Sequence, residues 1–165
     1  MALHKILRYP DARLKIISEP VINFDQQLRV LLADLVETMD AAPYGVGIAA
    51  PQIGFQQRII IVDCTKTRRP VPNHGRLILV NPELITWDGM ALGREGCMSI
   101  PDYTGNVIRA VHIELHALNE SGEKNSYQFE NFEARAVQHE LDHLEGILFI
   151  DRLVSRRTDL FQRKS

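Results

Sequence analysis

The motif HELDH, at residues 139–143, holds the side chains best placed to do chemistry. On an α-helix, residues four apart stack on one face about one turn apart, so His139 and His143 can reach a single metal ion. Glu140 lies beside them and could move a proton there without binding the ion itself. The alternative is a helix with solvated polar residues, which is weaker because both histidines lie in register with Phe132 and Ala136. The H-E-x-x-H spacing therefore predicts a metal site with an acid/base beside it.

Two histidines do not complete a metal site, and Cys97 is the best candidate for a third ligand. It lies in GREGCMSIP, residues 93–101, a string that predicts a tight turn. A thiolate suits a borderline-soft divalent ion, and two His with one Cys leave a position open for catalysis. The alternative for Cys97 is a buried, apolar-like cysteine, and the residues alone leave both interpretations open. Cys64 ends a predicted strand with no partner ligand nearby, so we expect it to have no role.

The other histidines form a weaker constellation. His112, Glu114 and His116 share one face of a predicted strand, opposite its apolar face. An extended strand separates the two histidines by ~13 Å, which is too far for one ion. We expect these three residues to form a solvated outer face, and we assign no role to His4 and His74 in their polar, loop-like surroundings.

The small-residue segment GVGIAAPQIG, residues 45–54, contains G-x-G but is not a dinucleotide fingerprint. No further glycine follows at the required offset, and the predicted strand comes after the segment rather than before it. Glycine and alanine let a backbone approach a ligand closely, and Gln52 could donate an amide hydrogen bond into a site. Taken alone, the segment favours the simpler interpretation of a tight turn.

Composition limits the class of protein. The chain has 165 residues, 45% apolar and 24% charged, with a formal net charge of -2, which fits one domain over residues 1–165. The small net charge argues against a dedicated nucleic-acid or membrane-surface binder. No apolar run approaches the ~18 residues of a membrane span, and the N-terminus lacks the apolar block of a signal peptide. Two cysteines are too few for a disulfide framework, so we expect a reducing, cytoplasmic location.

The elements that must position these residues can be read from periodicity. Helical spacing predicts helices from Asp25, as N-cap, to Met39 and from about Asn131 to Leu144, with Gly146 as the stop of the second. The second helix has two apolar stripes beside one polar stripe, which predicts packing on both sides. Strands are predicted at residues 58–63, 77–80, 83–87, 107–118 and 127–129. The predicted class is α+β: mainly antiparallel strands packed around a central metal-binding helix, with one further N-terminal helix.

Three strings in order carry a resemblance to a known family: GVGIAAPQ at 45–52, EGCMS at 95–99 and QHELDHLEG at 138–146. They closely resemble the three signature motifs of the peptide deformylases, and RYPDARL, RIIIVD, VNPEL and ILFIDRL extend the resemblance over most of the chain. One departure is Met98, where the family usually has leucine. The resemblance implies a metal-dependent hydrolase of protein biosynthesis that removes the N-formyl group from the initiator methionine of nascent polypeptides and releases formate.

The resemblance also implies roles for individual residues. Glu140 would be the general acid/base, Gln52 and the backbone N–H of Met98 would stabilise the oxyanion, and Gly47 would hydrogen-bond the substrate backbone. Three residues would hold one divalent ion: Cys97, His139 and His143. The family typically works with Fe²⁺, and the donor set also suits Zn²⁺, Ni²⁺ or Co²⁺.

Glu95 and Arg109 are expected to support the site, because Glu95 adjoins the ligand Cys97 and Arg109 lies on the strand that leaves that turn. A carboxylate that binds the far nitrogen of a ligand histidine fixes the orientation of its ring. The alternative is a plain surface ion pair.

Two other functions remain possible at this point. A non-catalytic metal-binding domain of the same fold would not need Glu140, and a zinc endopeptidase would need a ligand beyond the helix, where Glu145 follows but no histidine does. Catalysis is favoured because Glu140 and Gln52 stand at the matching positions. The expected partners are N-formylmethionyl nascent peptides, with no direct nucleic-acid site and no membrane. The tail after Asp151 is short and basic, whereas many members have a longer C-terminal helix, so the sequence leaves ribosome docking open.

Overall fold

The computed structural model describes residues 2–43 and 45–163 of the chain. Its framework is one sheet in which the five main strands follow the order β1-β2-β3-β4-β5, with β6 paired to β4. The strands are β1 (Gly47–Ala49), β2 (Ile59–Asp63), β3 (Arg76–Cys97), β4 (Ile100–Leu118), β5 (Lys124–Glu130) and β6 (Leu160–Gln162). Every pairing between these strands is antiparallel. The predicted α+β class with mainly antiparallel strands is therefore confirmed.

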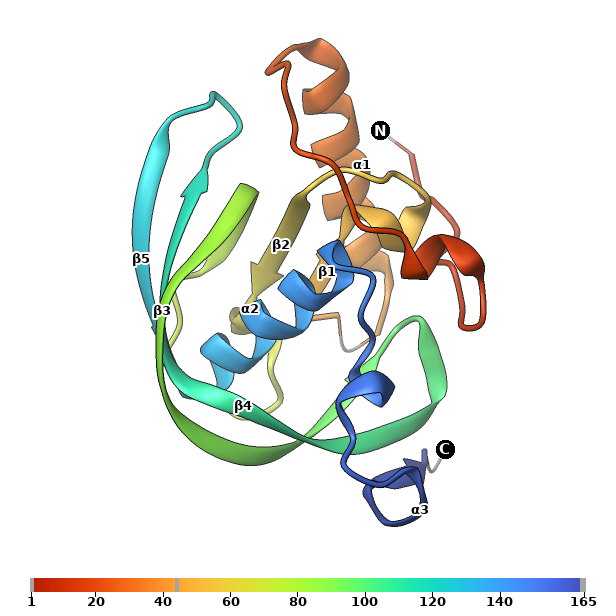
Figure 1. Ribbon diagram of the computed structural model, residues 1–165. Helices are drawn as coiled ribbons and strands as arrows, with labels where there is room; N and C mark the ends of the chain where they lie inside the picture. Colours follow the sequence, from red (N-terminus) through yellow and green to blue (C-terminus); the bar gives the residue numbers. More distant parts are fainter. Residues whose placement is uncertain (1, 44, 164–165) are drawn as a thin grey trace.

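Helix α2 (Asn131–Leu144) lies in the hollow of this curved sheet, with the long strands β3 and β4 bending around it (Figure 1). Its bounds are those predicted from periodicity. Gly146 ends the helix region with a φ of 71°, and a side chain there would collide with the backbone of Lys15, so both the conformation and the space require glycine. The apolar face of α2, including Ala134, Val137 and Leu144, packs on the sheet.

Helix α1 (Gln26–Ala41) covers the other face of β1 and β2 (Figure 1). The predicted N-cap is confirmed, because Asp25 accepts a hydrogen bond from the backbone N–H of Leu28. Alternate residues of β2 face opposite helices: Ile59 and Ile61 pack towards α1, and Ile60 and Val62 pack in the cluster beneath α2. Burial on both faces explains why this strand is a continuous apolar run rather than an alternating one.

Two predicted strands prove to be one. The segments 77–80 and 83–87 belong to the continuous strand β3, and a register shift between Val80 and Glu83 accommodates Asn81, whose φ is 49°. The prediction of two separate strands was wrong, because a bulge within one strand and a break between two strands look alike in sequence. The strand continues to Cys97, so the predicted tight turn at 93–101 is reduced to Met98 and Ser99 between β3 and β4. The predicted strands 107–118 and 127–129 lie within β4 and β5.

The polar stripe of α2 is not a solvent face. Gln138 exchanges two hydrogen bonds with the backbone of Ala110 on β4, and Arg135 donates to the backbone carbonyls of Ala91 and Val107. Of the four residues of this stripe, Arg135, Gln138, Asp142 and Glu145, only Glu145, just beyond the helix, is exposed. Strands β3 and β4 therefore cover the polar side of α2, while Asn131 and Phe132 at its start are exposed.

Short helices complete the described chain. They are η1 (Ala12–Lys15), η2 (Ala50–Ile53), η3 (Cys64–Lys66), η4 (Phe149–Arg152) and α3 (Arg156–Asp159). The segment 45–54, for which a tight turn was favoured, consists of strand β1 followed by the single turn of η2. Within residues 2–43 and 45–163, no helix is long and apolar enough to cross a membrane.

Candidate active site

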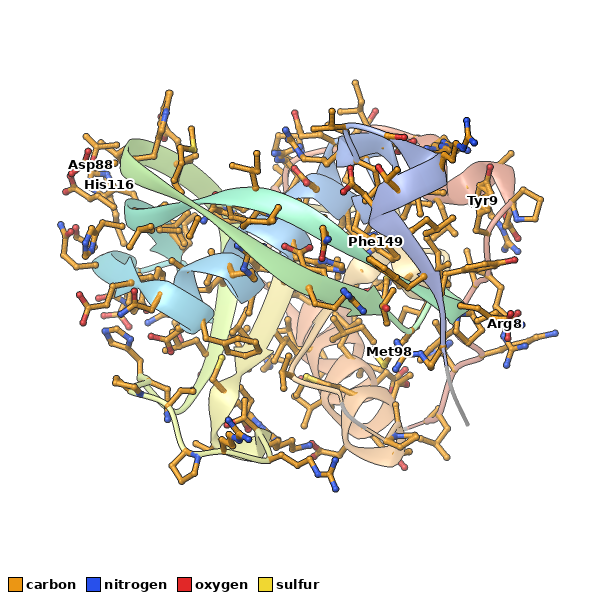
Figure 2. The ribbon with its side chains drawn as sticks, turned by 90° about the horizontal axis from the view of Figure 1, so that it is seen from below. Arg8, Tyr9, Asp88, Met98, His116 and Phe149 are labelled. Atoms are coloured by element: carbon orange, nitrogen blue, oxygen red, sulfur yellow. The ribbon has the colours of Figure 1, made fainter. Side chains whose placement is uncertain are left out.

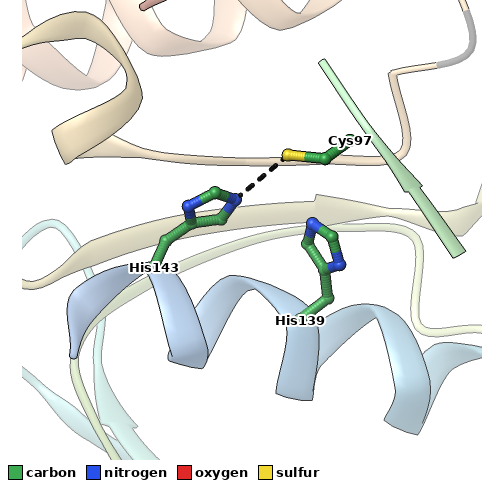
Figure 3. Close-up of side chains that lie close together, drawn as sticks. All are labelled: Cys97, His139 and His143. Carbon is green, nitrogen blue, oxygen red and sulfur yellow. Dashed lines mark hydrogen bonds between the residues drawn. The ribbon is translucent and has the colours of Figure 1, made fainter. Parts of the chain in front are cut away.

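Three side chains that could hold a metal ion converge where the turn between β3 and β4 meets helix α2. The Sγ of Cys97, at the end of β3, lies 3.4 Å from Nε2 of His143, and His139 stands one turn earlier on α2 (Figure 3). One ligand atom from each of the three residues lies within 4.8 Å of the others. The residues alone left two interpretations of Cys97 open, and the structure places its sulfur beside both imidazoles.

The electrostatics of this cluster suit a cation. Burial alone would raise the pKa of the Cys97 thiol, but the imidazoles of His143 and His139 hold it well below its usual range. Two buried polar atoms here, Oε1 of Glu140 and Nδ1 of His143, have no hydrogen-bond partner among the described residues. Buried polar atoms without partners point to a further group at the site. A thiolate with two imidazoles is also a donor set that borderline-soft divalent metals prefer, so these residues fit such an ion.

Glu95 holds one of these histidines in place. Its Oε1 lies 2.9 Å from Nδ1 of His139, and because a carboxylate only accepts, Nδ1 carries the hydrogen and Nε2 is left to bind a metal. Arg109 donates two hydrogen bonds to Glu95, and Arg135 donates a third. Burial by itself would raise the pKa of Glu95, yet the hydrogen bonds from Arg109 and His139 keep it well below its usual range. The expectation that Glu95 and Arg109 support the site, rather than form a surface pair, is confirmed.

Sequence reasoning missed the rest of this buried network. Nη1 of Arg109 donates to Asp142 at 2.6 Å, and Arg152 donates two further hydrogen bonds to the same carboxylate. One signal was available: Arg109 has the same strand parity as Val107 and Ile113, so it is an arginine on an apolar face. A charge at such a position requires a buried partner.

Gln52 is fixed at both ends of its amide. Its Oε1 accepts from the backbone N–H of Ala49, and its Nε2 donates to Oγ of Ser99 at 3.1 Å while lying 3.7 Å from Sγ of Cys97. The short helix η2 thus presents the donor end of Gln52 to the cluster. Ser99 is fully buried and was not singled out from the sequence.

Glu140 is buried against strand β1. Burial raises its pKa, although the charges of His139 and His143 act in the opposite direction. A Cβ added to Gly47 would lie 2.6 Å from Oε2 of Glu140, so the glycine at this position allows the close approach of strand and carboxylate. A carboxylate with a raised pKa and an oxygen that has no hydrogen-bond partner among the described residues is suited to proton transfer.

A cavity of about 1180 Å³ leads to the cluster. Its lining includes Gly47, Gln52, Cys97, Met98, His139 and Glu140. The structure therefore brings six of the seven predicted site residues to one cavity, and the seventh, His143, is buried behind Cys97, with its Nε2 3.4 Å from the sulfur. The histidines to which no site was assigned lie elsewhere or make other contacts: His116 sits at the far end of the sheet from Met98 (Figure 2), and His112 is exposed. His4, at the cavity rim, bonds to Asp34.

A profile of the family described as polypeptide deformylase matches residues 3–159. The chain belongs to this family. It is 39% identical over 164 residues to a peptide deformylase of Acidobacterium capsulatum, covering 99% of this chain and 94% of that one. It is 41% identical over 153 residues to peptide deformylases of Neisseria meningitidis, covering 93% and 88%.

Solved deformylase structures share the fold. The peptide deformylase of Thermotoga maritima superimposes with a TM-score of 0.86 at 33% identity, covering 94% of this chain and 100% of that one. A class I type b peptide deformylase of Acinetobacter baumannii with Met-Ala-Ser bound gives 0.85 at 37% identity, covering 92% and 99%. The predicted family and its activity are confirmed: the chain is a metal-dependent deformylase that removes the N-formyl group from nascent peptides.

The endopeptidase alternative has no support in the structure. Glu145, the only candidate ligand that it offered beyond the helix, is exposed and forms an ion pair with Arg58 at 2.7 Å.

Proposed function

We propose that Cys97, His139 and His143 hold one divalent ion of the deformylase and that Glu140 is its general acid/base. The observation that carries this proposal is the convergence of three ligand atoms within 4.8 Å beside a buried carboxylate with an unpartnered oxygen. These residues are drawn from two elements, so the site needs the folded hairpin of β3 and β4 against α2.

A divalent ion bound there supplies Lewis-acid chemistry: it polarises the formyl carbonyl and lowers the pKa of water towards neutrality. Glu140 takes the proton of the attacking water and returns it to the leaving amine as the amide C–N bond breaks. Nε2 of Gln52 and the backbone N–H of Met98 donate hydrogen bonds to the carbonyl oxygen as it gains negative charge. The products are formate and a free α-amino group.

The substrate is proposed to run along the edge of the sheet. Strand β1 pairs only with β2 in the described sheet, so its outer edge is open beside Glu140. An extended peptide can add to such an edge through backbone hydrogen bonds, and Gly47 is the residue proposed to make them. The bound Met-Ala-Ser in the Acinetobacter baumannii relative supports an N-formylmethionyl peptide as the substrate of this chain.

The native ion is proposed to be Fe²⁺. The support is the donor set, since one thiolate with two imidazoles accommodates Fe²⁺ and also Zn²⁺, Ni²⁺ or Co²⁺. The charge of the Cys97 thiolate makes any ion here a milder Lewis acid than three neutral ligands would. A formyl carbonyl, which lacks a carbon substituent, is open enough to attack for such an ion to suffice.

We further propose that residues 1–165 form one catalytic domain. Because its substrates are nascent chains, we propose that the protein works in the cytoplasm, where these chains emerge. A ribosome contact is assigned to Arg156, which is exposed on α3.

The test is formate release from formyl-Met-Ala-Ser, with metal analysis on the same anaerobically purified sample. We expect about one ion per chain, loss of activity with a chelator, and recovery on adding Fe²⁺. Unformylated Met-Ala-Ser is the control and should remain intact. Full activity after the ion has been removed would contradict the proposed site, and cleavage of the unformylated peptide would indicate an endopeptidase.

A further inference from the structure

The mouth of the active-site cavity is strongly basic, although the chain as a whole has a net charge of -2. Among the described residues, the only acidic ones that line the cavity are Glu95 and Glu140, and both are buried. Two of the basic lining residues are paired: Arg135 with Glu95, and Lys66 with Asp40. The remaining basic residues have no carboxylate within 4 Å in the described parts of the chain, and they are Lys5, Arg8, Arg68, Arg69, Arg94 and Arg163.

Arg163 is held close to the metal-binding cluster by the C-terminal strand. Strand β6 pairs with β4 at residues 103–105, and the backbone N–H of Arg163 donates to the carbonyl of Asp102 at 2.7 Å. The guanidinium then lies against Gly96, the neighbour of Cys97, where a methyl group on Gly96 would collide with its Nη2. The absence of a side chain at residue 96 therefore leaves room for this positive charge one residue from a proposed ligand.

Arg94 is held by the same strand. Its guanidinium carbon lies 3.7 Å from the ring centroid of Phe161, and its Nε donates to Asn106 at 3.1 Å. A cation–π contact orients the guanidinium without neutralising its charge. Strand β6 thus positions two arginines at the mouth: Arg94 stacks on its Phe161, and Arg163 directly follows the strand. Charges held in place lose less conformational entropy when they bind a ligand than free side chains do.

The established substrate must pass this mouth. With the formyl group at the cluster and the methionine inside the cavity, the following residues leave at about 3.3 Å each. The residues directly after methionine then leave through a mouth whose lining includes Arg94 and Arg163, which have no carboxylate partner among the described residues. We propose that Arg163 and Arg94 are specificity-determining residues that favour nascent peptides with aspartate or glutamate directly after the formylmethionine. This inference rests on the proposed location of the formyl group at Cys97, His139 and His143.

The test compares amidated peptides, so that no terminal carboxylate contributes. Formyl-Met-Asp-Ala-amide and formyl-Met-Ala-Asp-amide are each compared with the isosteric asparagine peptide on the metal-loaded enzyme. We expect kcat/KM for one or both aspartate peptides to be about 3–5-fold higher at low salt, which is the usual size of an exposed charge pair. The effect should lie in KM, because a charge far from the reacting atoms binds substrate and transition state alike. It should shrink at ~0.5 M salt as the charges are screened.

Arginine variants test which residues cause the preference for aspartate peptides. Arg163→Gln and Arg94→Gln should each lower the ratio of aspartate to asparagine kcat/KM, and the double variant should bring it close to one. Because both peptides are measured on one preparation, the ratio does not depend on the fraction of active enzyme. Arg157→Gln is the matched control: it removes the same charge from an exposed arginine of α3 that does not line the cavity, and its ratio should equal that of the wild type.

Equal turnover of the aspartate and asparagine peptides at both positions would overturn the proposal, and so would a ratio that survives in the double variant. Competition by a short RNA, combined with equal turnover of the two peptides, would assign the basic mouth to nucleic acid instead. Failure to release formate from formyl-Met-Ala-Ser-amide would contradict the proposed catalytic site and is distinguishable from these outcomes, because this neutral peptide does not depend on the arginines.

Discussion

The two ends of helix α2 lie among the same kinds of side chain, but these side chains make different contacts at each end. Near its start, Glu133 accepts hydrogen bonds from Nδ1 and the backbone N–H of His74, at 2.6 and 2.8 Å, and Cys64 is buried nearby. Near its end, Glu95 accepts from Nδ1 of His139 beside Cys97. Each region thus has a cysteine, a histidine and a buried carboxylate.

The two thiols differ because their nearest charges differ. Burial raises the pKa of Cys64, the carboxylates of Glu133 and Asp63 raise it further, and the result is about 12. Burial acts in the same direction on Cys97, but the imidazoles there overcome it. Burial alone therefore does not make a thiol inert or reactive; the sign of the neighbouring charge decides whether a thiolate is present to bind a metal.

The histidines of the two regions, His74 and His139, differ in their surroundings. In the described residues, only Cys97, His139 and His143 bring three metal-binding groups together. The His74 side chain is 43% exposed and packs edge-on against Phe129, so its pairing with Glu133 ties a loop to α2. The same carboxylate–histidine pair is structural at one end of the helix and positions a proposed metal ligand at the other.

The largest difference is expected between the cysteines. Cys97→Ala should lower the bound metal from about one ion per chain to near zero and reduce formate release to background, because two histidines rarely hold a catalytic ion. Cys64→Ala should leave the bound metal and the formate release unchanged, since the Cys64 thiol has no partner ligand among the described residues. Metal analysis and formate assays on the two variants decide this, and retention of one ion per chain in Cys97→Ala would show that the proposed ligand set is wrong.

Glu140→Gln should reduce formate release by at least ~100-fold while the variant keeps its metal. The amide preserves shape but cannot accept the proton of the attacking water. Glu133→Gln is the control, because it alters the other buried glutamate of the same helix, and its activity per bound ion should match that of the wild type. Near-normal turnover of metal-loaded Glu140→Gln would refute the assigned role, and loss of its metal would show a structural one.

Glu95→Gln should weaken metal affinity or activity by about 10–100-fold, as is usual when a histidine ligand loses the carboxylate that orients it. Competition with a chelator measures the affinity. Glu133→Gln, which removes the corresponding partner of His74, should show no change in metal affinity. If the two variants held metal equally tightly, the contrast between the ends of α2 would not extend to their carboxylates.

The smallest expected effect concerns Asp63, beside Cys64. Its burial raises its pKa, but hydrogen bonds from Thr65 and Arg76 outweigh this and lower the pKa below its usual value. Because the folded pKa lies below the unfolded value of about 3.9, the stabilisation is complete above that pH and disappears as pH falls through the folded pKa. Asp63→Asn should therefore cost ~1–2 kcal/mol of unfolding free energy at pH 7 and less in acid.

Urea unfolding of wild type and Asp63→Asn at pH 7 and near pH 3 measures this difference. Both proteins lose metal in acid, so the comparison between them isolates the carboxylate. A difference in stability that is the same at both pH values would mean that the charge of Asp63 contributes nothing.

The sequence by itself determined the two helices, the antiparallel class and the content of the site. Helical periodicity is a local property, so Asp25 marked the start of α1, and Gly146 marked the end of α2. The i, i+4 spacing likewise placed His139 and His143 on one face before any packing was known. The family resemblance named Cys97, Gln52, Met98 and Gly47, which spacing alone left open.

Only the tertiary structure decided how these parts meet. Gln52 and His143 lie against the sulfur of Cys97 because strands β2 to β4 pair around α2. In sequence, these two residues are 45 and 46 positions away from Cys97. The bulge at Asn81 keeps β3 continuous, and the Arg109–Asp142 ion pair is formed between a strand and a helix. Strand pairing and the burial of charge depend on partners distant in the chain, so no local pattern in the sequence contains them.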